Sequence, residues 1–413
     1  MNKIQTLKGG TSRTLQTLRG FRDFLPQQAL QRDWLKAKIV SVFEKWGYDP
    51  METPTLEPLE LFAGQIGEDE KLFFKFEDNG GRQVALRYDQ TVPTCRVVGA
   101  NQLTMPFKRY QIQPAFRAEN TQKGRYREFL QCDADIFGST SPLADAEVIA
   151  LSLDIYKSLG FKNAKVLIND RSLLSDLPYE AIVAIDKLAK IGEDGVIKDM
   201  IKKGISENDA KKYLNKTTQI KPNETIKTIF EYLKSCGFDK SWYAFEPTLA
   251  RSFSYSTGPI WEVVIPEIGG GSVLGGERFD NLVEKVSGKK IPGTGFGLGF
   301  DRTLEAAIQL GLVPEFKTKT KILVTIFSPE LRDKSIRLST NLRRAGVGVE
   351  LYPDDRIKLD KQLKYADAKG IPYVAILGPE EVSKNIIKLK NMKSTEQKEL
   401  KIEDLINLLK IDN

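Results

Sequence analysis

Residues 107–137 contain two strand-like runs in which apolar and polar side chains alternate. Successive side chains of a strand point to opposite faces of the sheet, so the two sets lie on different faces. In the second run, Leu130, Cys132, Ala134 and Ile136 share one face, and Arg125, Arg127, Phe129, Gln131, Asp133 and Asp135 share the other. In the first run, Tyr110, Ile112, Phe116 and Ala118 oppose Arg109, Gln111, Gln113, Arg117 and Glu119. The pattern predicts two adjacent strands that bury one face and present a charged face.

The charged face has two interpretations. Antiparallel sheets commonly bury one face and leave the other solvated. The alternative is a ligand site, because the face combines arginines, which suit phosphate, with carboxylates, which suit an amine. The "GLGFDR" stretch favours the ligand site. It places Arg302 just after a glycine-rich strand where a helix should begin, so that Arg302 could reach a ligand over the same sheet.

The remaining pattern places these strands in a larger domain. Residues 33–48 have the apolar spacing of an amphipathic helix. Residues 72–89 form two strand-like runs around Asn79-Gly80, a strong hairpin signal, and continue the polar alternation through Arg87, Asp89 and Thr91. We expect a helix over 139–160, a mostly helical inserted module over 171–240 and glycine-rich strands over 241–300.

A second domain is predicted after the linker at 313–320. The apolar runs 321–327, 347–353 and 371–377 are separated by helical stretches, as in a small α/β domain with a largely parallel sheet. The chain has 413 residues, enough for two or three domains of ordinary size. We therefore place the domains at 1–318 and 319–413.

Composition narrows the class of protein and its location. No apolar run is long enough for a transmembrane helix, and the first residues lack the apolar core of a secretory signal. The three cysteines, Cys95, Cys132 and Cys236, are too far apart for a CxxC zinc site and argue against a disulfide framework. We expect a cytoplasmic protein. The net charge of +7 says little about nucleic-acid binding.

The chain contains no histidine. Serine–histidine triads, histidine general bases and histidine-bound metals are therefore excluded. Any catalysis must use carboxylates, arginines, lysines, backbone donors or a hard metal ion.

Three segments then become recognisable as a set. In chain order, "EKWGYDPMETPTLEP", "FRAENTQKGRYREFLQCDADIFG" and "GTGFGLGFDRTLEAA" resemble motifs 1, 2 and 3 of class II aminoacyl-tRNA synthetases. Within that class, "LRGFRDFLP", "LRYDQTVP", "QKGRYREF" and "GGERFDNLV" resemble the histidyl-tRNA synthetases. The resemblance runs from about residue 18 to the C-terminus. It implies an α+β fold: an antiparallel-sheet catalytic core with a helical insertion, followed by a small α/β anticodon-binding domain.

The resemblance also implies a reaction and its partners. Histidine would be activated by ATP to histidyl-adenylate and then transferred to its tRNA, with Mg²⁺ bridging the phosphates and no protein residue assigned as a metal ligand. The first step needs no general base, because the attacking carboxylate is already ionised, so positioning and electrostatics can carry it. The motif 1 segment, interrupted at Pro54, would form a symmetric homodimer.

Roles carried over by position concern phosphate, adenine and histidine. For ATP the resemblance implies Arg117 and Arg251 at the α-phosphate, Arg302 at the γ-phosphate, Arg125 at the terminal phosphate, Glu119 at the adenine amine and Phe129 against the adenine ring. For histidine it implies Asp89 and Thr91 at the α-amine and Gln131 at the backbone part. Asp135 would face the imidazole, with Arg117, Arg251 and Tyr255 also lining the site. Pairing across the sheet is the alternative for Arg109, Arg127 and Asp133, and for Asp133 it is what we expect.

The chain departs from the family pattern in the imidazole pocket. The arginine-glycine-leucine-aspartate-tyrosine-tyrosine signature appears as "RSFSYS" at 251–256, with Ser254 and Ser256 at the aspartate and second tyrosine positions. Phe279 stands where a tyrosine is usual. Two phenol hydroxyls are thus lost, while the adenylation residues are kept.

Three alternatives share part of the pattern. A non-catalytic paralogue, such as the regulatory subunit of ATP phosphoribosyltransferase, lacks the anticodon domain, whereas 321–413 and Arg117, Arg251 and Arg302 are present here. The same features count against a module that only senses uncharged tRNA. A class II synthetase for proline or threonine should not combine "QKGRYREF" with Gln131 and Asp135.

Overall fold

The computed structural model describes residues 16–64, 71–121, 124–251, 255–269 and 271–411. The chain divides into two compact units. One comprises Met1–Asp23 and Trp34–Val313, and the other Phe24–Asp33 and Pro314–Asn413.

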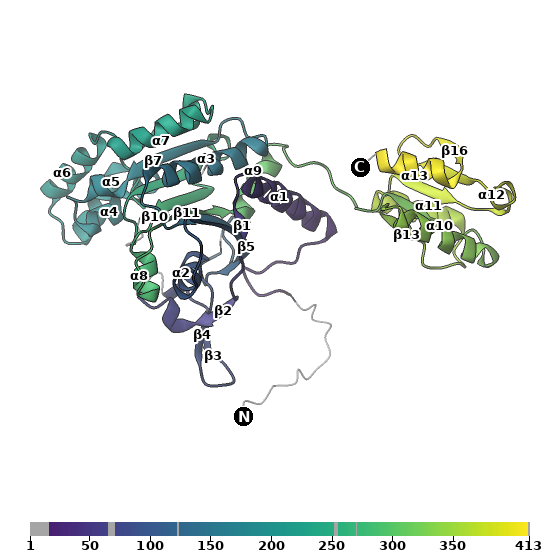
Figure 1. Ribbon diagram of the computed structural model, residues 1–413, viewed down its shortest axis with the longest axis horizontal. Helices are drawn as coiled ribbons and strands as arrows, with labels where there is room; N and C mark the ends of the chain where they lie inside the picture. The colour runs from purple at the N-terminus through teal and green to yellow at the C-terminus, as the bar shows by residue number, and fades with distance from the viewer. Residues whose placement is uncertain (1–15, 65–70, 122–123, 252–254, 270, 412–413) are drawn as a thin grey trace. The chain divides into compact units, whose positions relative to one another are not determined.

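The first unit is built around an eight-stranded, mainly antiparallel sheet (Figure 1). Its strands, in spatial order, are β1 (Asp49–Pro50), β5 (Phe107–Phe116), β6 (Glu128–Phe137), β11 (Gly293–Gly299), β10 (Leu274–Arg278), β9 (Pro259–Val264), β7 (Lys165–Asp170) and β8 (Tyr243–Phe245). Strands β5 and β6 pair antiparallel from Phe107↔Phe137 to Phe116↔Glu128. The pair predicted from the alternation is confirmed.

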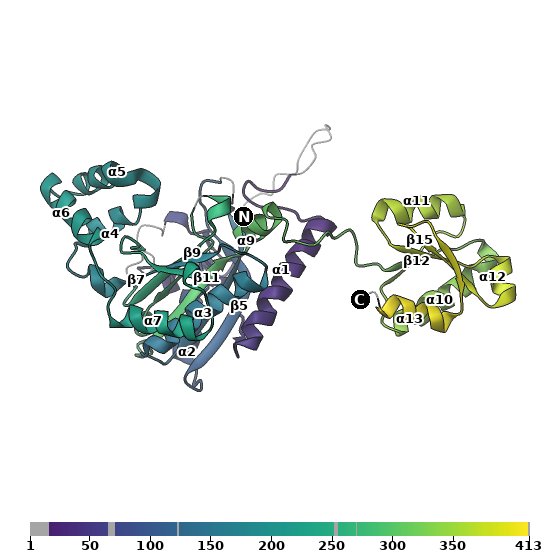
Figure 2. The same ribbon diagram turned by 90° about the horizontal axis from the view of Figure 1, so that it is seen from above.

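The apolar face of this sheet carries the main core. Cys132, Ala134 and Ile136 of β6 are buried there with side chains from the covering helices. These are α1 (Pro26–Lys45), α3 (Pro142–Ser158), α7 (Glu224–Ser235) and α9 (Phe300–Gln309), and Figure 2 shows α3 and α7 lying along the sheet. Helix α1 begins at Pro26, before the predicted start. A proline fits this position because it is tolerated in the first turn of a helix.

The middle of the polar face is also buried, so a fully solvated face is not what the structure shows. Arg109, Gln111, Asp133 and Asp135 are all buried. Helix α2 (Thr91–Ala100) packs beside α8 (Leu282–Ser287), and Cys95 of α2 shares an apolar cluster with Phe137 and Phe279. The first hairpin also ends earlier than the alternation suggested: β4 stops at Leu86 and Thr91 already begins α2.

A small three-stranded sheet, β2 (Leu56–Pro58), β4 (Gln83–Leu86) and β3 (Lys75–Glu77), lies beside this region. Its β3–β4 turn contains the predicted Asn79-Gly80, and Asp78 Oδ1 accepts hydrogen bonds from the backbone N–H of Gly80 and Arg82, both at 2.9 Å. A short 3₁₀ turn, η1 (Leu59–Leu61), follows β2.

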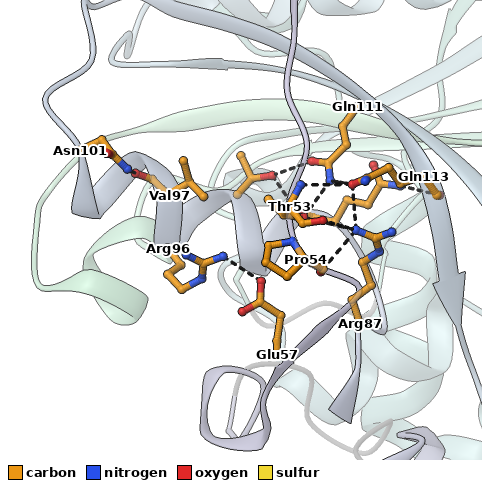
Figure 3. A network of polar contacts seen from close by, with 11 residues as sticks. Thr53, Pro54, Glu57, Arg87, Arg96, Val97, Asn101, Gln111 and Gln113 are labelled. Atoms are coloured by element: carbon orange, nitrogen blue, oxygen red, sulfur yellow. Dashed lines mark hydrogen bonds and ion pairs between the residues drawn. The ribbon is translucent and has the colours of Figure 1, made fainter. Parts of the chain in front are cut away.

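The segment that carries Pro54 is held by one buried arginine (Figure 3). Arg87 Nη1 donates to the Thr53 carbonyl and to Gln113 Oε1, both at 2.8 Å. Gln111 Nε2 donates to Thr53 Oγ1 at 2.8 Å. Residues 51–55 therefore lie between β1 and β2 without strand pairing of their own, and polar side chains tie them to β5.

The inserted module is helical, as predicted, with its own apolar core around Leu174, Ile182, Val196 and Leu214. Its elements are η3 (Arg171–Leu174), α4 (Tyr179–Ile185), α5 (Leu188–Lys202) and α6 (Glu207–Thr218), and α7 continues the chain back to η4 (Lys240–Trp242) and β8. A further turn, η5 (Pro266–Ile268), follows β9.

The second unit contains a five-stranded sheet of order β13-β12-β14-β15-β16. Its elements are β12 (Ile322–Val324), η6 (Pro329–Leu331), α10 (Arg332–Arg344), β13 (Val349–Leu351), α11 (Leu359–Lys369), β14 (Tyr373–Ile376), α12 (Pro379–Lys384), β15 (Ile387–Asn391), β16 (Gln397–Leu400) and α13 (Ile402–Ile411). The three predicted strands pair parallel, and β15 and β16 add an antiparallel hairpin that was not predicted. Among the described helices of the whole chain, none has the length and hydropathy to cross a membrane.

Candidate active site

Glycines on β11 form the floor of the candidate site. Gly295, Gly297 and Gly299 are the cross-strand partners of Asp135, Asp133 and Gln131 on β6. Such partners point to the same face of a sheet. A Cβ on Gly295 would overlap Asp135 Oδ1, and one on Gly297 would lie 2.9 Å from Gln131 Nε2. Glycine at alternate positions of β11 therefore lets the polar side chains of β6 lean over the neighbouring strand.

Asp135 is held by an ion pair with Arg109 on β5. Arg109 is 0% exposed and Asp135 is 2% exposed. Burial raises the pKa of Asp135 and Arg109 opposes the rise, leaving that pKa at about 6. At neutral pH the acid expected to face the imidazole is therefore ionised.

Asp133 does not make the cross-sheet ion pair that we expected. Its partner in register is Gln111, and its Oδ2 accepts a hydrogen bond from Gln131 Nε2 at 3.0 Å. Burial raises the pKa of Asp133 to about 8, so the neutral form predominates at neutral pH. The arginine goes to Asp135 because that residue, one row further along β6, is its direct partner. Arg127 instead donates from Nε to the carbonyl oxygen of Glu119 at 3.1 Å.

The predicted amine ligands lie at the start of helix α2. Asp89 is buried, and its Oδ1 accepts a hydrogen bond from the Val92 N–H at 3.2 Å. Burial raises its pKa, partly offset by that backbone hydrogen bond and by Arg117. Gln90 Nε2 donates to the carbonyl oxygen of Gln131 at 3.1 Å. This bond holds the segment of Asp89 and Thr91 next to the part of β6 that pairs with the glycines of β11.

Arg117 lies among aromatic rings. Its guanidinium carbon is 4.3 Å from the centre of the Tyr88 ring and 5.1 Å from that of Phe129. Its Nε donates to the carbonyl oxygen of Tyr88 at 3.3 Å. The side chain is thus fixed in direction next to Phe129, the ring predicted to lie against adenine.

Arg302 and Arg125 come together at the other end of the site. Arg302 lies in the first turn of α9, directly after β11, as predicted. Burial and the neighbouring Arg125 both lower the pKa of Arg302. Arg125 Nη1 is 3.2 Å from Glu119 Oε2. Two adjacent arginines repel each other, so this end of the site favours an anion.

Arg251 is clamped by two carboxylates that the sequence analysis did not identify. Its Nη2 lies 3.3 Å from Glu277 Oε1 and its Nη1 lies 3.6 Å from Glu262 Oε1. A Cβ on Gly275 would overlap its guanidinium, so a second glycine makes room here. Burial would lower the pKa of Arg251, but the two acids raise it above its ordinary value. The backbone φ of 40° is unusual for a residue other than glycine.

The residues that depart from the family pattern, Ser256 and Phe279, lie in different surroundings from each other. Ser256 is buried and its hydroxyl donates a hydrogen bond to Glu277 Oε2. Phe279 is 1% exposed, and its ring packs against Phe137 at 5.8 Å between centres, inside an apolar cluster. Tyr255 packs against the same cluster. Burial raises the pKa of its phenol, and the negative charge of Glu277 raises it further. Ser254 lies outside the described residues.

Electrostatic coupling joins these groups into one site. The charges of Arg117 and Glu277 both act on Asp89. Glu262 acts on both Arg251 and Arg302, and so connects the acidic part of the site to the arginine end. The arrangement suits a molecule with a cationic group at one end and a polyphosphate at the other.

Known proteins resemble this chain in sequence and in fold over nearly its whole length. The family described as "Histidyl-tRNA synthetase" matches residues 20–191 and 180–303, and the "Anticodon binding domain" matches residues 321–411. The protein named "Histidine--tRNA ligase" of Wolinella succinogenes is 36% identical over 425 residues, which cover 93% of this chain and 95% of that protein. Its namesake from Cytophaga hutchinsonii is 33% identical, covering 95% of this chain and 98% of that protein.

A solved structure has the same architecture. The crystal structure of histidyl-tRNA synthetase from Nostoc sp. PCC 7120 superposes with a TM-score of 0.82 at 28% sequence identity. The match covers 97% of this chain and all of that one. The chain therefore resembles that protein in fold over nearly its whole length.

Proposed function

Because the chain belongs to the histidyl-tRNA synthetase family, we propose that its candidate site ligates histidine to tRNA in the following way. The observation that carries the proposal is the site's division into an acidic part around Asp89 and Asp135 and an arginine end at Arg125 and Arg302. Histidine brings the cationic amine, and ATP brings the polyphosphate.

In the first step, the carboxylate of histidine attacks the α-phosphorus of ATP, and pyrophosphate leaves. Arg117 and Arg251 are proposed to hold the α-phosphate while negative charge redistributes there. Arg302 and Arg125 would hold the outer phosphates that depart. Fixed positive charge, partly desolvated by burial at Arg251 and Arg302, lowers the barrier without a proton transfer, which suits a chain that lacks histidine.

The nucleoside and amino-acid ends are assigned from the same surroundings. Phe129 would stack on adenine, and Glu119, beside Arg125, would accept from the adenine amine. Asp89 and Thr91 would bind the α-amine. Gln131 would hold the backbone part of histidine. At the imidazole end, Asp135 and Tyr255 would line the pocket.

Mg²⁺ would enter with ATP as a counter-ion of its phosphates. Within the described parts of the chain, no group of three or more acids or cysteines is arranged to hold a metal by itself. That fits a magnesium ion that keeps most of its waters and binds chiefly through substrate phosphates.

In the second step, the terminal ribose hydroxyl of tRNA attacks the carbonyl carbon of the adenylate, and AMP leaves. The hydroxyl proton would pass to a phosphate oxygen of the departing AMP. The C-terminal unit, which matches the anticodon-binding family, would bind the anticodon, and the motif 1 segment would form a homodimer. We further propose a cytoplasmic location, where tRNA is charged for translation.

A non-catalytic paralogue remains the alternative that the sequence raised, and no observation favours it. The curated relatives that match nearly the whole chain are named as ligases, and the C-terminal unit is present. Charging of tRNA transcripts tests the function. We expect histidine to be attached to the transcript with a histidine anticodon, and no charging of that transcript would contradict the proposal.

A further inference from the structure

Glu277 lies in the same cross-strand row of the sheet as Asp135, with a glycine between them. Asp135, Gly295 and Glu277 are consecutive cross-strand partners on β6, β11 and β10. All three therefore point to the same face, with the glycine in the middle. Neighbouring strands lie about 4.8 Å apart, so the two acidic residues start about 10 Å apart at their Cα atoms. Asp135 Oδ1 lies where a Cβ on Gly295 would stand, so this carboxylate leans over the glycine toward β10. We call the region between that carboxylate and Glu277 the slot.

The carboxylate of Glu277 is held in place from two directions. It is 6% exposed. Ser256 donates to Oε2, and Arg251 Nη2 lies 3.3 Å from Oε1. An ionised carboxylate offers about four acceptor sites, so it can take a further hydrogen bond from a ligand. Ser256 stands where the family pattern has a tyrosine. Its hydroxyl orients the carboxylate of Glu277, whose longer side chain can reach further than the serine hydroxyl.

We infer that Glu277 is a specificity-determining residue that accepts one ring N–H of the bound histidine while Asp135 accepts the other. This inference rests on the proposed function. A neutral imidazole has one donor and one acceptor, whereas the protonated ring has two donors. Acceptors on both sides of the slot therefore select the protonated ring.

Other charged and titratable groups, from the elements around this row, interact electrostatically with its acids or with their partners. They are Asp89 and Cys95 at helix α2, Arg109 on β5, Arg117 after β5, Asp133 on β6, Arg171 after β7, Glu262 on β9, and Arg251 and Tyr255 before β9. Arg109 and Arg251 weaken the attraction for a cation, but each is already engaged by a carboxylate. Asp89 adds a further acid that both Arg117 and Glu277 influence.

The protonation states give a pH profile with a definite sign. Free imidazole loses its proton with a pKa of about 6.5, so the binding form of the substrate becomes scarce above that pH. Asp135 is ionised only above its pKa of about 6. The kcat/KM for histidine should therefore peak between these values and fall by up to about tenfold per pH unit on the alkaline side.

The experiment measures histidine-dependent pyrophosphate exchange from about pH 6 to about pH 8.5, the range around the ring pKa. Wild-type enzyme should show the alkaline fall with histidine. An analogue whose triazole ring stays neutral over this range should be a poor substrate with a flat profile. E277Q should raise the KM for histidine about 10- to 100-fold near pH 6.5 and flatten the fall, because a hydrogen bond to a charged group is lost.

E262Q is the matched control. Glu262 contacts the same arginine, but its partner in register is Gly275, outside the row of Asp135. It should change kcat through Arg251 without raising the KM for histidine. If E277Q and E262Q lower kcat alike and leave that KM unchanged, Glu277 only positions Arg251 and the inference is overturned.

The wild-type profile decides the question even if E277Q fails to fold. A kcat/KM for histidine that stays flat above about pH 7, past the ring pKa, contradicts selection of the protonated ring. Absence of histidine-dependent exchange at every pH would instead contradict the proposed function, so the two failures are distinguishable.

Discussion

The guanidinium of Arg109 forms a buried ion pair with the carboxylate of Asp135, the acid proposed to bind the imidazole. Asp135→Ala should raise the KM for histidine about 10- to 100-fold, because a ring N–H loses its charged acceptor. The KM for ATP should stay nearly constant. Steady-state exchange kinetics with each substrate varied in turn measure both.

The same substitution should also destabilise the fold. It leaves Arg109 buried without its partner, and breaking one side of a buried ion pair costs about 3–5 kcal/mol. Urea unfolding provides the measurement. A variant with wild-type stability and wild-type KM for histidine would show that the pair serves neither role.

Asp133 predicts how stability depends on pH. Its folded-state pKa of about 8 lies above its ordinary value of 3.8, so the folded state binds this proton more tightly than the unfolded state does. The stabilisation is therefore complete below about pH 4 and is lost as the pH rises through about 8. Asp133→Asn keeps an acceptor for Gln131 and removes the titration.

We therefore expect Asp133→Asn to be more stable than the wild type above about pH 8 and to gain nothing in acid. Thermal unfolding across this range compares the two proteins. Parallel curves would show that the buried carboxyl does not titrate as proposed.

Loss of an arginine at the phosphate end should abolish activation. Arg302→Ala and Arg117→Ala should each lower the rate of pyrophosphate exchange about 100- to 1,000-fold, because each removes a preorganised charge from the reacting phosphates. Arg82→Ala is the control, since Arg82 is an exposed arginine on the β3–β4 hairpin. Wild-type exchange by either site variant would refute its assigned role.

The glycine floor makes a steric prediction. A Cβ at position 295 would overlap Asp135 Oδ1 and lie 2.7 Å from the carbonyl oxygen of Ala134. Gly295→Ala must displace Asp135, so it should raise the KM for histidine more than that for ATP. Gly80→Ala, where the nearest atom is the flexible Asp78 carboxylate at 3.3 Å, should have little effect. Equal KM values in the two variants would contradict the proposed floor.

Assembly is tested by sedimentation. The segment around Pro54 is anchored to β5 by Arg87 and Gln111, which gives a proposed dimer-forming segment a fixed position. We expect a species of about twice the chain mass of 46.5 kDa at micromolar concentration. A monomer under those conditions would rule out the homodimer.

Local patterns predicted much of this architecture. Alternation identified β5 and β6, and the glycine-rich run before Arg302 identified β11 and the start of α9. Both signals depend only on neighbouring residues. Phe279 shows the limit: its ring packs in an apolar cluster with Phe137 and Cys95, and no pattern of neighbouring residues indicates these partners.

The partners of charged side chains were harder to predict. Arg109 pairs with Asp135 instead of Asp133 because the register of β5 against β6 decides the row. Glu277 was missed because it shares a row with Asp135 only through two strand pairings, by way of β11, between segments far apart in the sequence. No pattern of neighbouring residues in the sequence indicates that these two strands lie on either side of β11.

The most direct test is pyrophosphate exchange by the wild-type protein with each of the twenty amino acids in turn. We expect ATP-dependent exchange with histidine and little with any other amino acid, because the slot between Asp135 and Glu277 offers acceptors to two ring donors. A preference for another amino acid, or no exchange with histidine, would contradict it.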